Sequence, residues 1–401
     1  MTVTVVGIGA DGWDGLTAAA RALIAGADVL VGGGRALAYV PEVRGRREPL
    51  PTPLVAGLPA LLEAHAGRAV CVLASGDPMF FGIGTTLVGL LGADEVRVVP
   101  QPSSVSLACA RLGWAVEATD AFSAVGRPLD AVRAALAPGR RMLVLSAGAQ
   151  TPGALARLLV EAGYGPSTVT VLGWLGGPDE TRHEGVARSW ADPPGGASGL
   201  NVVAVACAAE PGARVLGRAP GLPDEAYEHD GQLTKREVRA VALARLVPLP
   251  GQLLWDVGGG AGSIGIEWMR THPAARAVSV EARPDRARRI ATNAAALGVP
   301  GLEVVTGAAP DALAGLPAPD AVFVGGGART PGLLDACWTA LAPGGRLVVN
   351  AVTLETEALL VARHAALGGD LIRLEVSHAA PIGGATAWRP MLPVTMWALT
   401  R

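Results

Sequence analysis

The chain has 401 residues, of which half are hydrophobic and 17% are charged, and its formal net charge is −2. This length favours two or three domains, and the apolar content is large enough to fill the core of each. So small a net charge gives no general attraction for nucleic acid or for an anionic membrane. Gly and Pro lie mainly at the ends of apolar runs, which is typical of an α/β protein with many short turns.

The cysteines and the apolar runs indicate the cellular compartment. Four cysteines lie far apart in apolar stretches: Cys71, Cys109, Cys207 and Cys337. They predict buried, reduced thiols and therefore a reducing compartment. No basic leader precedes the first strand, and no apolar run reaches the roughly 18 residues of a membrane span. We therefore expect a cytoplasmic protein that does not bind membranes.

Residues 1 to about 115 alternate short β-branched runs with stretches rich in Ala and Leu. We predict strands at 2–9, 28–34 and 69–75, a helix at 16–27, a loop at 76–84 that leads into a helix, and a strand, loop and helix within 95–113. Because strands and helices alternate, this part of the chain predicts a parallel sheet that is covered on both faces.

Residues 116 to 208 show a different pattern. Residues 140–163 predict a strand, a loop and a helix, whereas 167–177, 181–191 and 199–208 predict strands joined by turns. This order indicates a second lobe with a more mixed sheet. Residues 208–232 are rich in Pro and Gly and show little periodicity, so they mark the domain boundary. We expect a first domain at 1–210, with lobes of about 1–115 and 116–208, a linker at 211–221 and a second domain at 222–401.

The second domain returns to alternating strands and helices. We predict helices at 233–247, 283–298, 333–345 and 354–369, and strands at 252–260, 277–282, 302–310, 320–327, 346–352, 371–377 and 394–400. Such an order predicts a Rossmann-like α/β domain.

The sequence LLWDVGGGAGSIGIEW, at residues 253–268, fits two cofactor motifs. The motif D-x-G-x-G-x-G, which indicates S-adenosylmethionine, consists of Asp256, Gly258, Gly260 and Gly262. The motif G-x-G-x-x-G, which indicates a dinucleotide, consists of Gly260, Gly262 and Gly265. In both, the glycines allow backbone N–H groups and a helix N-terminus to face the ligand at close range.

Features around the glycines favour S-adenosylmethionine. Glu281, at the end of the next strand, suits the ribose hydroxyls of either cofactor and does not decide. Asp256 can hold the loop through its N–H groups and meet the cationic end of S-adenosylmethionine, but it would repel a pyrophosphate. A Pro-Gly-Gly turn within LAPGGRLVV and two final strands with hairpin-like spacing complete the pattern. The domain thus resembles class I S-adenosylmethionine-dependent methyltransferases.

Two further glycine segments limit the chemistry. Methyltransferases that alkylate amino groups often carry a polar motif where this chain has only Gly325 to Gly327, which favours a carbon acceptor. Near the start, Gly7, Gly9 and Gly12 again spell G-x-G-x-x-G. Because the next strand has no acid for a ribose, we do not expect NAD there.

The first 210 residues resemble the tetrapyrrole methylase family. The shared motifs, in order, are VVGIGADGWDGLT, SGDPMFFG, PSSVSLACARLGW, TPGALARLL, LGGPDE and LNVVAV. Residues 222–401 resemble the decarboxylating precorrin methyltransferases through QLTKREVRA, DVGGGAGSIGIEW, TGAAPDAL and PGGRLVVNAVTLETE. The expected fold is therefore a two-lobed tetrapyrrole methylase followed by a class I methyltransferase domain.

The resemblance also implies a reaction. It implies that S-adenosylmethionine binds at two sites and that reduced precorrin-6 is methylated at carbons 5 and 15. It further implies loss of the carbon-12 acetate carboxyl, giving precorrin-8 in aerobic cobalamin biosynthesis. The macrocycle supplies the carbon nucleophile, so no metal is required, and the six histidines show no metal-ligand spacing. By analogy we expect a homo-oligomer, with a tetramer formed through the C-terminal domain.

For the first domain, the resemblance implies a cofactor cleft between the lobes. The matching cofactor residues are Gly9, Asp77, Ser103 and Ser104. Arg127 is a candidate for binding a substrate carboxylate. Asp77 can instead be a turn residue before a proline, and Arg127 can instead form a surface ion pair. Where relatives usually carry a histidine, this chain has Val125, so any role of that histidine must be filled differently.

For the second domain, the resemblance implies a cofactor site around the glycine loop. The candidate cofactor residues are Thr234, Asp256, Gly258, Gly260, Gly262, Glu281 and Ala309. Lys235 and Arg236 are candidates for clamping substrate carboxylates, or they are solvated charges. Thr234 and Glu237 form T-x-x-E, which also predicts a capping box at a helix start.

Three alternatives remain open from the sequence. One is a tetrapyrrole methylase fused to an NAD-dependent dehydrogenase. The second is a class I RNA methyltransferase with an accessory domain, against which the missing polar acceptor motif and the absent basic surplus count. The third is a regulator that binds S-adenosylmethionine without turnover.

Overall fold

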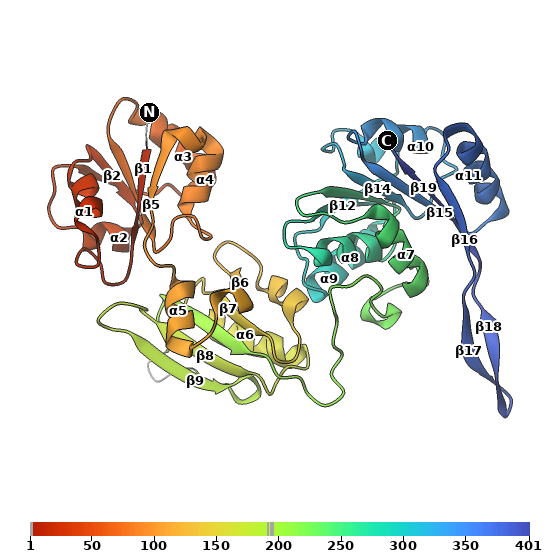
Figure 1. Cartoon of the computed structure of the whole chain (residues 1–401), viewed down its shortest axis with the longest axis horizontal. Coiled ribbons are helices and arrows are strands. Elements are labelled where there is room, and N and C mark those ends of the chain that lie inside the picture. The colour runs from red at the N-terminus through yellow and green to blue at the C-terminus, as the bar shows by residue number, and fades with distance from the viewer. Residues whose placement is uncertain (1–2, 191, 193–195) are drawn as a thin grey trace. The chain divides into compact units, whose positions relative to one another are not determined.

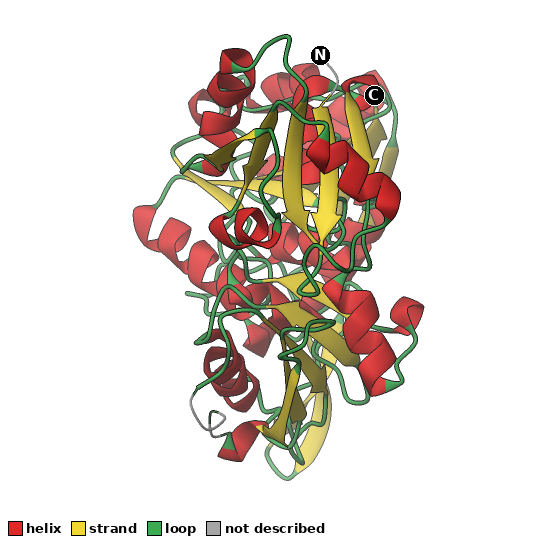
Figure 2. Ribbon diagram, turned by 90° about the vertical axis from the view of Figure 1, so that its left-hand side faces the viewer, coloured by secondary structure: helices red, strands yellow, loops and turns green. Residues whose placement is uncertain are grey.

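A computed structural model describes residues 3–190, 192 and 196–401 of the chain. The chain divides into two compact units, shown in Figure 1. The N-terminal unit comprises Met1–Leu129 and Ala137–Arg214, and the C-terminal unit comprises Asp130–Leu136 and Val215–Arg401. Both units combine helices with strands (Figure 2). Among the helices of the described residues, none combines the length and apolar character that a transmembrane span requires.

The first lobe of the N-terminal unit is a five-stranded parallel sheet of order β3-β2-β4-β1-β5. Its strands are β1 (Val3–Ile8), β2 (Val29–Gly32), β3 (Arg46–Pro49), β4 (Val70–Ser75) and β5 (Val96–Val99), and its helices are α1 (Ala18–Ala25), α2 (Gly34–Tyr39), α3 (Leu54–Ala64) and α4 (Ile83–Leu91). One core joins the strands to α3 and α4, and the other joins them to α1 and α2. The predicted parallel sheet with both faces covered is therefore confirmed.

The second lobe is a mixed sheet of order β6-β7-β10-β8-β9. It contains β6 (Asp120–Ser123), β7 (Arg141–Leu145), β8 (Thr168–Gly173), β9 (Thr181–Val186) and β10 (Asn201–Ala206), with helices α5 (Ser104–Leu112) and α6 (Thr151–Glu161). Only the β6–β7 pair among the described pairs is parallel, so the predicted mixed sheet is confirmed. Helix α5, expected in the first lobe, packs its buried face on this second sheet instead.

The C-terminal unit is built on a seven-stranded sheet of order β13-β12-β11-β14-β15-β19-β16. Its strands are β11 (Leu253–Val257), β12 (Arg276–Glu281), β13 (Glu303–Thr306), β14 (Ala321–Val324), β15 (Arg346–Ala351), β16 (Asp370–Leu374) and β19 (Val394–Thr400). Six strands run in the same direction, and β19 is antiparallel to both of its neighbours. Along the chain, strands β12 and β13 are added on one side of β11, and the strands from β14 onward are added on its other side. Ligands of open α/β sheets usually bind at this reversal of strand order.

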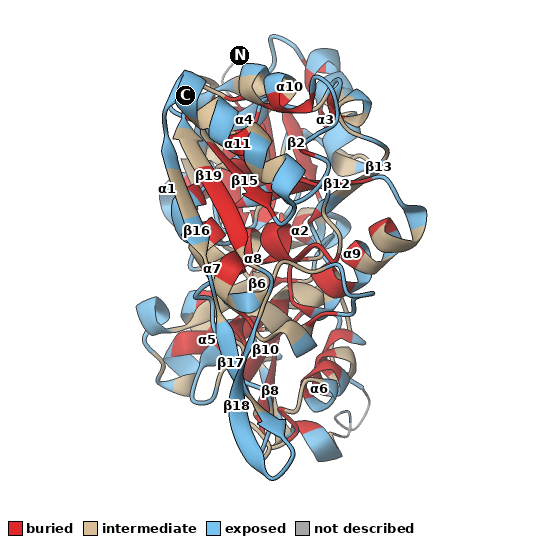
Figure 3. Ribbon diagram, turned by 90° about the vertical axis from the view of Figure 1, so that its right-hand side faces the viewer, coloured by how far each residue is buried: buried red, intermediate tan, exposed pale blue. Residues whose placement is uncertain are grey.

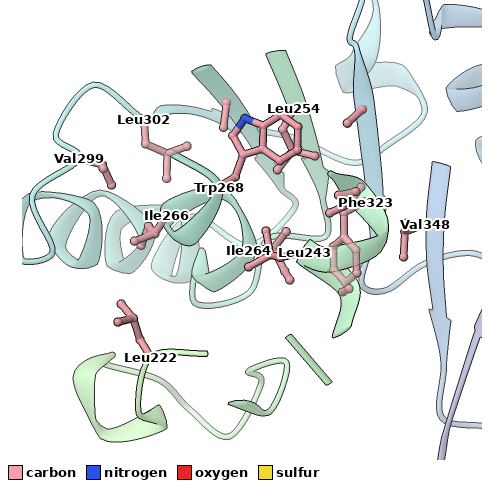
Figure 4. Close-up of a cluster of buried hydrophobic side chains, with 14 of the residues drawn as sticks. Leu222, Leu243, Leu254, Ile264, Ile266, Trp268, Val299, Leu302, Phe323 and Val348 are labelled. Atoms are coloured by element: carbon pink, nitrogen blue, oxygen red, sulfur yellow. The ribbon is translucent and has the colours of Figure 1, made fainter. Parts of the chain in front are cut away.

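Helices cover both faces of this sheet. The helices are α7 (Arg236–Leu246), α8 (Ser263–Thr271), α9 (Pro284–Ala296), α10 (Leu333–Ala340) and α11 (Leu354–Leu367). On one face, Leu243 of α7 and Trp268 of α8 pack with Leu254, Phe323 and Val348 of the strands (Figure 4). On the other face, residues of α10 and α11 form a second core with the alternate strand residues.

A two-stranded hairpin, β17 (Ser377–Ile382) and β18 (Ala385–Pro390), extends away from this sheet (Figure 1). Nearly all of its residues are exposed, in contrast to the buried strand β19 (Figure 3). Trp388 is 76% exposed and Ile382 is 63% exposed. We did not predict the hairpin, because no alternation of apolar and polar residues marks it.

Candidate functional site

A cavity of about 740 Å³ lies at the carboxyl ends of the central strands of the C-terminal unit. Its wall includes the loops that follow β11, β12, β13 and β14, the end of β15, and the segment 231–235 before α7. The cavity therefore lies at the point where the strand order reverses. Six predicted residues meet in its wall: Thr234, Lys235, Gly258, Gly260, Glu281 and Ala309.

The glycine loop after β11 has a backbone that other residues would not adopt easily. Gly258 and Gly260 have φ values of 74° and 59°, in the left-handed region. A Cβ atom on Gly260 would lie 3.0 Å from the carbonyl oxygen of Gln232, and one on Gly258 would lie 3.2 Å from the backbone nitrogen of Gly326. The loop thus leaves bare backbone between two neighbouring segments, as close approach of a ligand requires.

Glu281 ends β12 with its carboxylate beside this loop. Its side chain accepts hydrogen bonds from the backbone N–H of Gly260 at 2.9 Å and from that of Arg283 at 3.0 Å. The residue is only 6% exposed, and it lines the cavity. A carboxylate oxygen has further acceptor capacity, so Glu281 is placed to bind ligand hydroxyl groups.

The structure corrects the expected role of Asp256. Its side chain is 1% exposed and is not part of the cavity wall that the described residues form. Its Oδ2 accepts hydrogen bonds from the N–H of Gly265 at 3.1 Å and from Oγ of Ser279 at 3.4 Å. Burial, with a smaller contribution from the charge of Glu281, raises the pKa of Asp256 to about 7. Asp256 therefore ties β11 to the first turn of α8 and to β12, and the geometry gives no support to contact with a cofactor cation.

Gly262 and Arg236 also lie away from the cavity. Gly262 has a φ of 79° at the start of α8, and a Cβ there would lie 2.7 Å from Cγ2 of Ile290 in α9. It is needed for packing between helices rather than for ligand contact. Arg236 is exposed in the first turn of α7 and is not part of the described cavity wall.

The capping box predicted from Thr234 and Glu237 is wrong. Helix α7 begins at Arg236, so its N-cap is Lys235, and no described side chain caps it. The first helical hydrogen bond runs from the N–H of Arg239 to the carbonyl of Lys235. The carbonyl of Thr234 instead accepts a hydrogen bond from the Arg239 guanidinium. Lys235 lines the cavity, with its Nζ 3.4 Å from Oδ2 of Asp224.

Several lining residues were missed by the sequence reasoning, among them Arg286, Thr330, Asn350, Val352, Met391 and Leu392. Asn350 had a detectable signal, because it is the one polar residue in the apolar run LVVNAV at the end of a strand. Arg286 lies in the basic run RPDRARR, at residues 283–289. In the structure its Nε is 2.9 Å from Oδ2 of Asp230, which ties α9 to the segment before α7.

In the N-terminal unit, the loops after β1 and β4 meet the start of α5. The N–H of Gly76 donates to the carbonyl of Ile8, and a Cβ on Gly76 would lie 3.7 Å from the nitrogen of Ser104. Gly9 directly follows β1. The candidate cofactor residues of this unit therefore lie around one edge of its first sheet.

Asp77 and Ser103 make local hydrogen bonds within this region. The carboxylate of Asp77 accepts from the N–H of Met79 at 2.9 Å, as a turn residue does. Oγ of Ser103 caps α5 by accepting from the N–H of Ser106 at 3.1 Å. Both contacts are structural. Binding of a ligand by Asp77 or Ser103 stays a prediction.

Arg127 of the second lobe reaches the first lobe. Its guanidinium carbon lies 4.9 Å from the ring centre of Phe81, a cation–π contact. Phe81 is 43% exposed and has a φ of 52°, which is unusual for a bulky residue. Val125, at the position of the relatives' histidine, is 60% exposed nearby in the sequence.

Metal and thiol chemistry have little basis in the side chains that are described. No group of three or more His, Cys, Asp or Glu is arranged to hold a metal ion within the described residues. All four cysteines are buried and free. Burial raises the pKa of the Cys71 and Cys337 thiols to about 12, which makes them poor nucleophiles.

Comparison with known proteins assigns both units. A family of tetrapyrrole (corrin/porphyrin) methylases matches residues 2–190, and a precorrin methyltransferase domain matches residues 225–401. A precorrin-6Y C(5,15)-methyltransferase [decarboxylating] from Sinorhizobium sp is 50% identical over 100% of this chain and 96% of that protein. The chain belongs to this family. The Mycobacterium tuberculosis (strain ATCC 25618 / H37Rv) protein of the same description is 46% identical over 100% of both chains.

Membership in this family makes the chain a methyltransferase that depends on S-adenosylmethionine, and the bare glycine backbone with Glu281 suits that cofactor. The C-terminal domain of precorrin-6Y C5,15-methyltransferase from Rhodobacter capsulatus has 45% sequence identity and a TM-score of 0.44, covering 46% of this chain and 100% of that domain. Neither the dehydrogenase fusion nor the RNA methyltransferase finds support, and a purely regulatory role does not fit the family.

Proposed function

We propose that this chain methylates reduced precorrin-6 at carbons 5 and 15 and removes the carbon-12 acetate carboxyl as carbon dioxide, giving precorrin-8. The observation that carries the proposal is the cavity at the strand-order reversal of the C-terminal unit. Its glycine loop and Glu281 match a site for a nucleoside with an attached cationic chain. We infer the reaction from the family, and we take the cavity as the site of one of the two methyl transfers.

In the C-terminal unit, the side chains position the reactants. S-adenosylmethionine, when bound, supplies an electrophilic methyl group, and its leaving sulfur is neutral. Glu281 would bind the ribose hydroxyls, Ala309 would line the adenine, and the backbone at Gly258 and Gly260 would contact the amino acid end. Alignment of reactants and exclusion of water then account for catalysis, since an in-line transfer to carbon needs no covalent enzyme intermediate.

In the N-terminal unit, we place a second cofactor site at the edge where the loops after β1 and β4 meet α5. The supporting observation is the convergence of Gly9, Asp77, Ser103 and Ser104 around that edge. Arg127, held over the Phe81 ring, carries a charge that suits a substrate carboxylate. In this proposal the N-terminal unit methylates carbon 5 and the C-terminal unit methylates carbon 15.

We further propose that the chain self-associates through its C-terminal unit, with a tetramer as the expected form. The hairpin β17–β18 supports this, because an isolated two-stranded hairpin is at best marginally stable in water. Its exposed Trp388 and Ile382 give an apolar surface that a second copy can cover. Sedimentation of the full chain and of a Trp388→Ser, Ile382→Ser variant tests this; a dimer or tetramer that survives both changes counts against the hairpin.

The cytoplasmic location is retained as a proposal, which the four buried free thiols support. The reaction itself is tested by mass spectrometry after incubation with reduced precorrin-6 and methyl-labelled S-adenosylmethionine. We expect the product to gain two labelled methyl groups and to lose one carboxyl group. A product with a single methyl group and no release of carbon dioxide would refute the two-site scheme.

A further inference from the structure

The cavity of the C-terminal unit continues past the expected cofactor end. Glu281 lies at the end of β12. At the other end of the cavity, Asn350 lies in β15, Val352 directly follows β15, and Val394 begins β19. In the sheet order β12-β11-β14-β15, these two ends are three strand spacings apart, or roughly 14 Å. The methyl acceptor must reach the methyl group through the part of the cavity that the cofactor does not fill. The β15 end is therefore the place for the tetrapyrrole.

Asn350 is the unusual residue at this end. It lines the cavity and is only 9% exposed, yet its Oδ1 is buried with no hydrogen-bond partner among the described residues. Its neighbours on the same face of the sheet, Val348 and Met396, are apolar. Packing alone would favour another apolar side chain here, since a buried polar group without a partner is unfavourable. A carboxylate accepts hydrogen bonds only, so it would bind Nδ2 of this amide and not Oδ1. Rotation of the amide by 180° exchanges the two atoms and directs the Nδ2 donors to the position of the unpartnered oxygen.

The first turn of α7 lies at the same end of the cavity. Helix α7 packs against β15, and Val238 shares its core with Val348 and Val394. Both Lys235 and Val238 line the cavity together with Asn350. No described side chain caps α7, so the partial positive charge of its first N–H groups is available, and the ammonium of Lys235 adds to it.

Two acidic side chains oppose this positive charge. Asp224 lies 3.4 Å from Nζ of Lys235, and Glu237 is in the first turn of α7. The carboxylate of Glu237 is near His378, at 3.9 Å from its Nε2, and is 40% exposed. The positive charge of Lys235 and of the helix terminus, reduced by these two carboxylates, therefore balances a single further carboxylate and not several.

We propose that Asn350, Lys235 and the uncapped first turn of α7 bind one carboxylate arm of the tetrapyrrole, and that this arm is retained in the product. The inference rests on the proposed function. Decarboxylation moves the negative charge of the departing carboxylate into the ring, so a site that stabilises a carboxylate holds back its loss. A carboxylate held here is an anchor, which fixes the macrocycle with its acceptor carbon toward the methyl group.

The test compares full-length variants by initial rates of carbon dioxide release against reduced precorrin-6. Asn350→Leu removes the polar group at similar volume, and Asn350→Asp adds a negative charge at the same shape. We expect Asn350→Leu to raise KM for the tetrapyrrole by about 10- to 100-fold, the loss of a hydrogen bond to a charged group, with a smaller change in kcat. For Asn350→Asp, the rise in KM should grow with pH as the new carboxylate ionises.

A matched control comes from Thr395, whose Oγ1 is likewise buried without a partner among the described residues but which does not line the cavity. Thr395→Val should leave KM unchanged. If Asn350→Leu does not fold, Lys235→Gln carries the test, with an expected severalfold rise in KM. An unchanged KM in the folded Asn350 variants overturns the proposal. An equal loss of affinity for S-adenosylmethionine, measured by calorimetry, also overturns it, because the anchored carboxylate would then be the cofactor's own. Failure of the proposed function differs from both, since wild-type chain would release no carbon dioxide.

Discussion

Replacing Asp256 by Asn should stabilise the C-terminal unit at neutral and alkaline pH. Asp256 is fully buried below the glycine loop, and burial raises its pKa from the ordinary 3.8 to about 7. The folded state therefore binds a proton that the unfolded state releases between about pH 4 and pH 7. Consequently, the free energy of unfolding falls as pH rises through this range and remains lower above it. Asparagine is neutral throughout and can still accept the hydrogen bond from Gly265.

The structure sets the scale of this effect. A change of pKa from 3.8 to about 7 corresponds to roughly 4 kcal/mol, as an upper limit, at about 1.4 kcal/mol for each tenfold change in proton affinity. The measured gain will be smaller, because the new amide N–H group also needs a partner in a buried site. We expect the variant and the wild type to differ little near pH 5, and the variant to be more stable by about 1–3 kcal/mol near pH 8.

Urea unfolding from pH 5 to pH 8.5 measures this difference. Because four of the nine tryptophans lie in the N-terminal unit, the transition of the C-terminal unit is followed by hydrogen exchange of its own peptides, such as residues 253–268, at each urea concentration. Asp285→Asn, at an exposed ion pair, is a control that should show no such pH dependence. Equal pH profiles for wild type and Asp256→Asn would refute the reasoning. The variant should also keep its affinity for S-adenosylmethionine, and a large loss would restore the role in cofactor contact that the sequence suggested.

Two other substitutions test the surroundings of the cavity. Glu267→Ala removes a buried carboxylate that accepts hydrogen bonds from Arg239 and Tyr227. Arg239 keeps its ion pair with Asp224, but the buried donors left without a partner should cost about 3–5 kcal/mol of unfolding free energy in urea titrations; a loss below about 1 kcal/mol would contradict this. Asp230→Asn breaks ion pairs with Arg286 and Arg289 that hold the segment 231–235 beside the cavity, so S-adenosylmethionine should dissociate severalfold faster in stopped-flow measurements, with little change in thermal stability. An unchanged dissociation rate would show that this segment needs no such anchor.

Much of the fold could be predicted because strands that end in glycine loops mark the carboxyl edge of a parallel sheet. That rule placed Gly258, Gly260 and Glu281 at one edge, where the structure brings them together. The same rule did not predict strands that are charged or exposed. The edge strand β3 reads Arg-Arg-Glu-Pro, and the hairpin β17–β18 has no buried face, so neither shows apolar alternation.

The direction of individual side chains was harder to predict. Asp256 follows a strand in which alternate residues face opposite cores, and it shares the face of Leu254, below α8. Its motif position suggested a ligand contact, but the alternation of the strand turns it toward the N–H of Gly265. Asn350 is the opposite case. The sequence shows only a single polar residue at the end of a strand, and the structure is needed to show that this residue lines a cavity.

The central claim is that each chain binds S-adenosylmethionine at two sites and that Glu281 belongs to the one in the C-terminal unit. Calorimetric titration of the full chain with S-adenosylmethionine tests it directly, with Glu281→Ala beside the wild type. The account predicts two bound molecules per wild-type chain and one per variant chain, with the remaining site unchanged in affinity. Two sites of unaltered affinity in the variant, or a single site in the wild type, would contradict it.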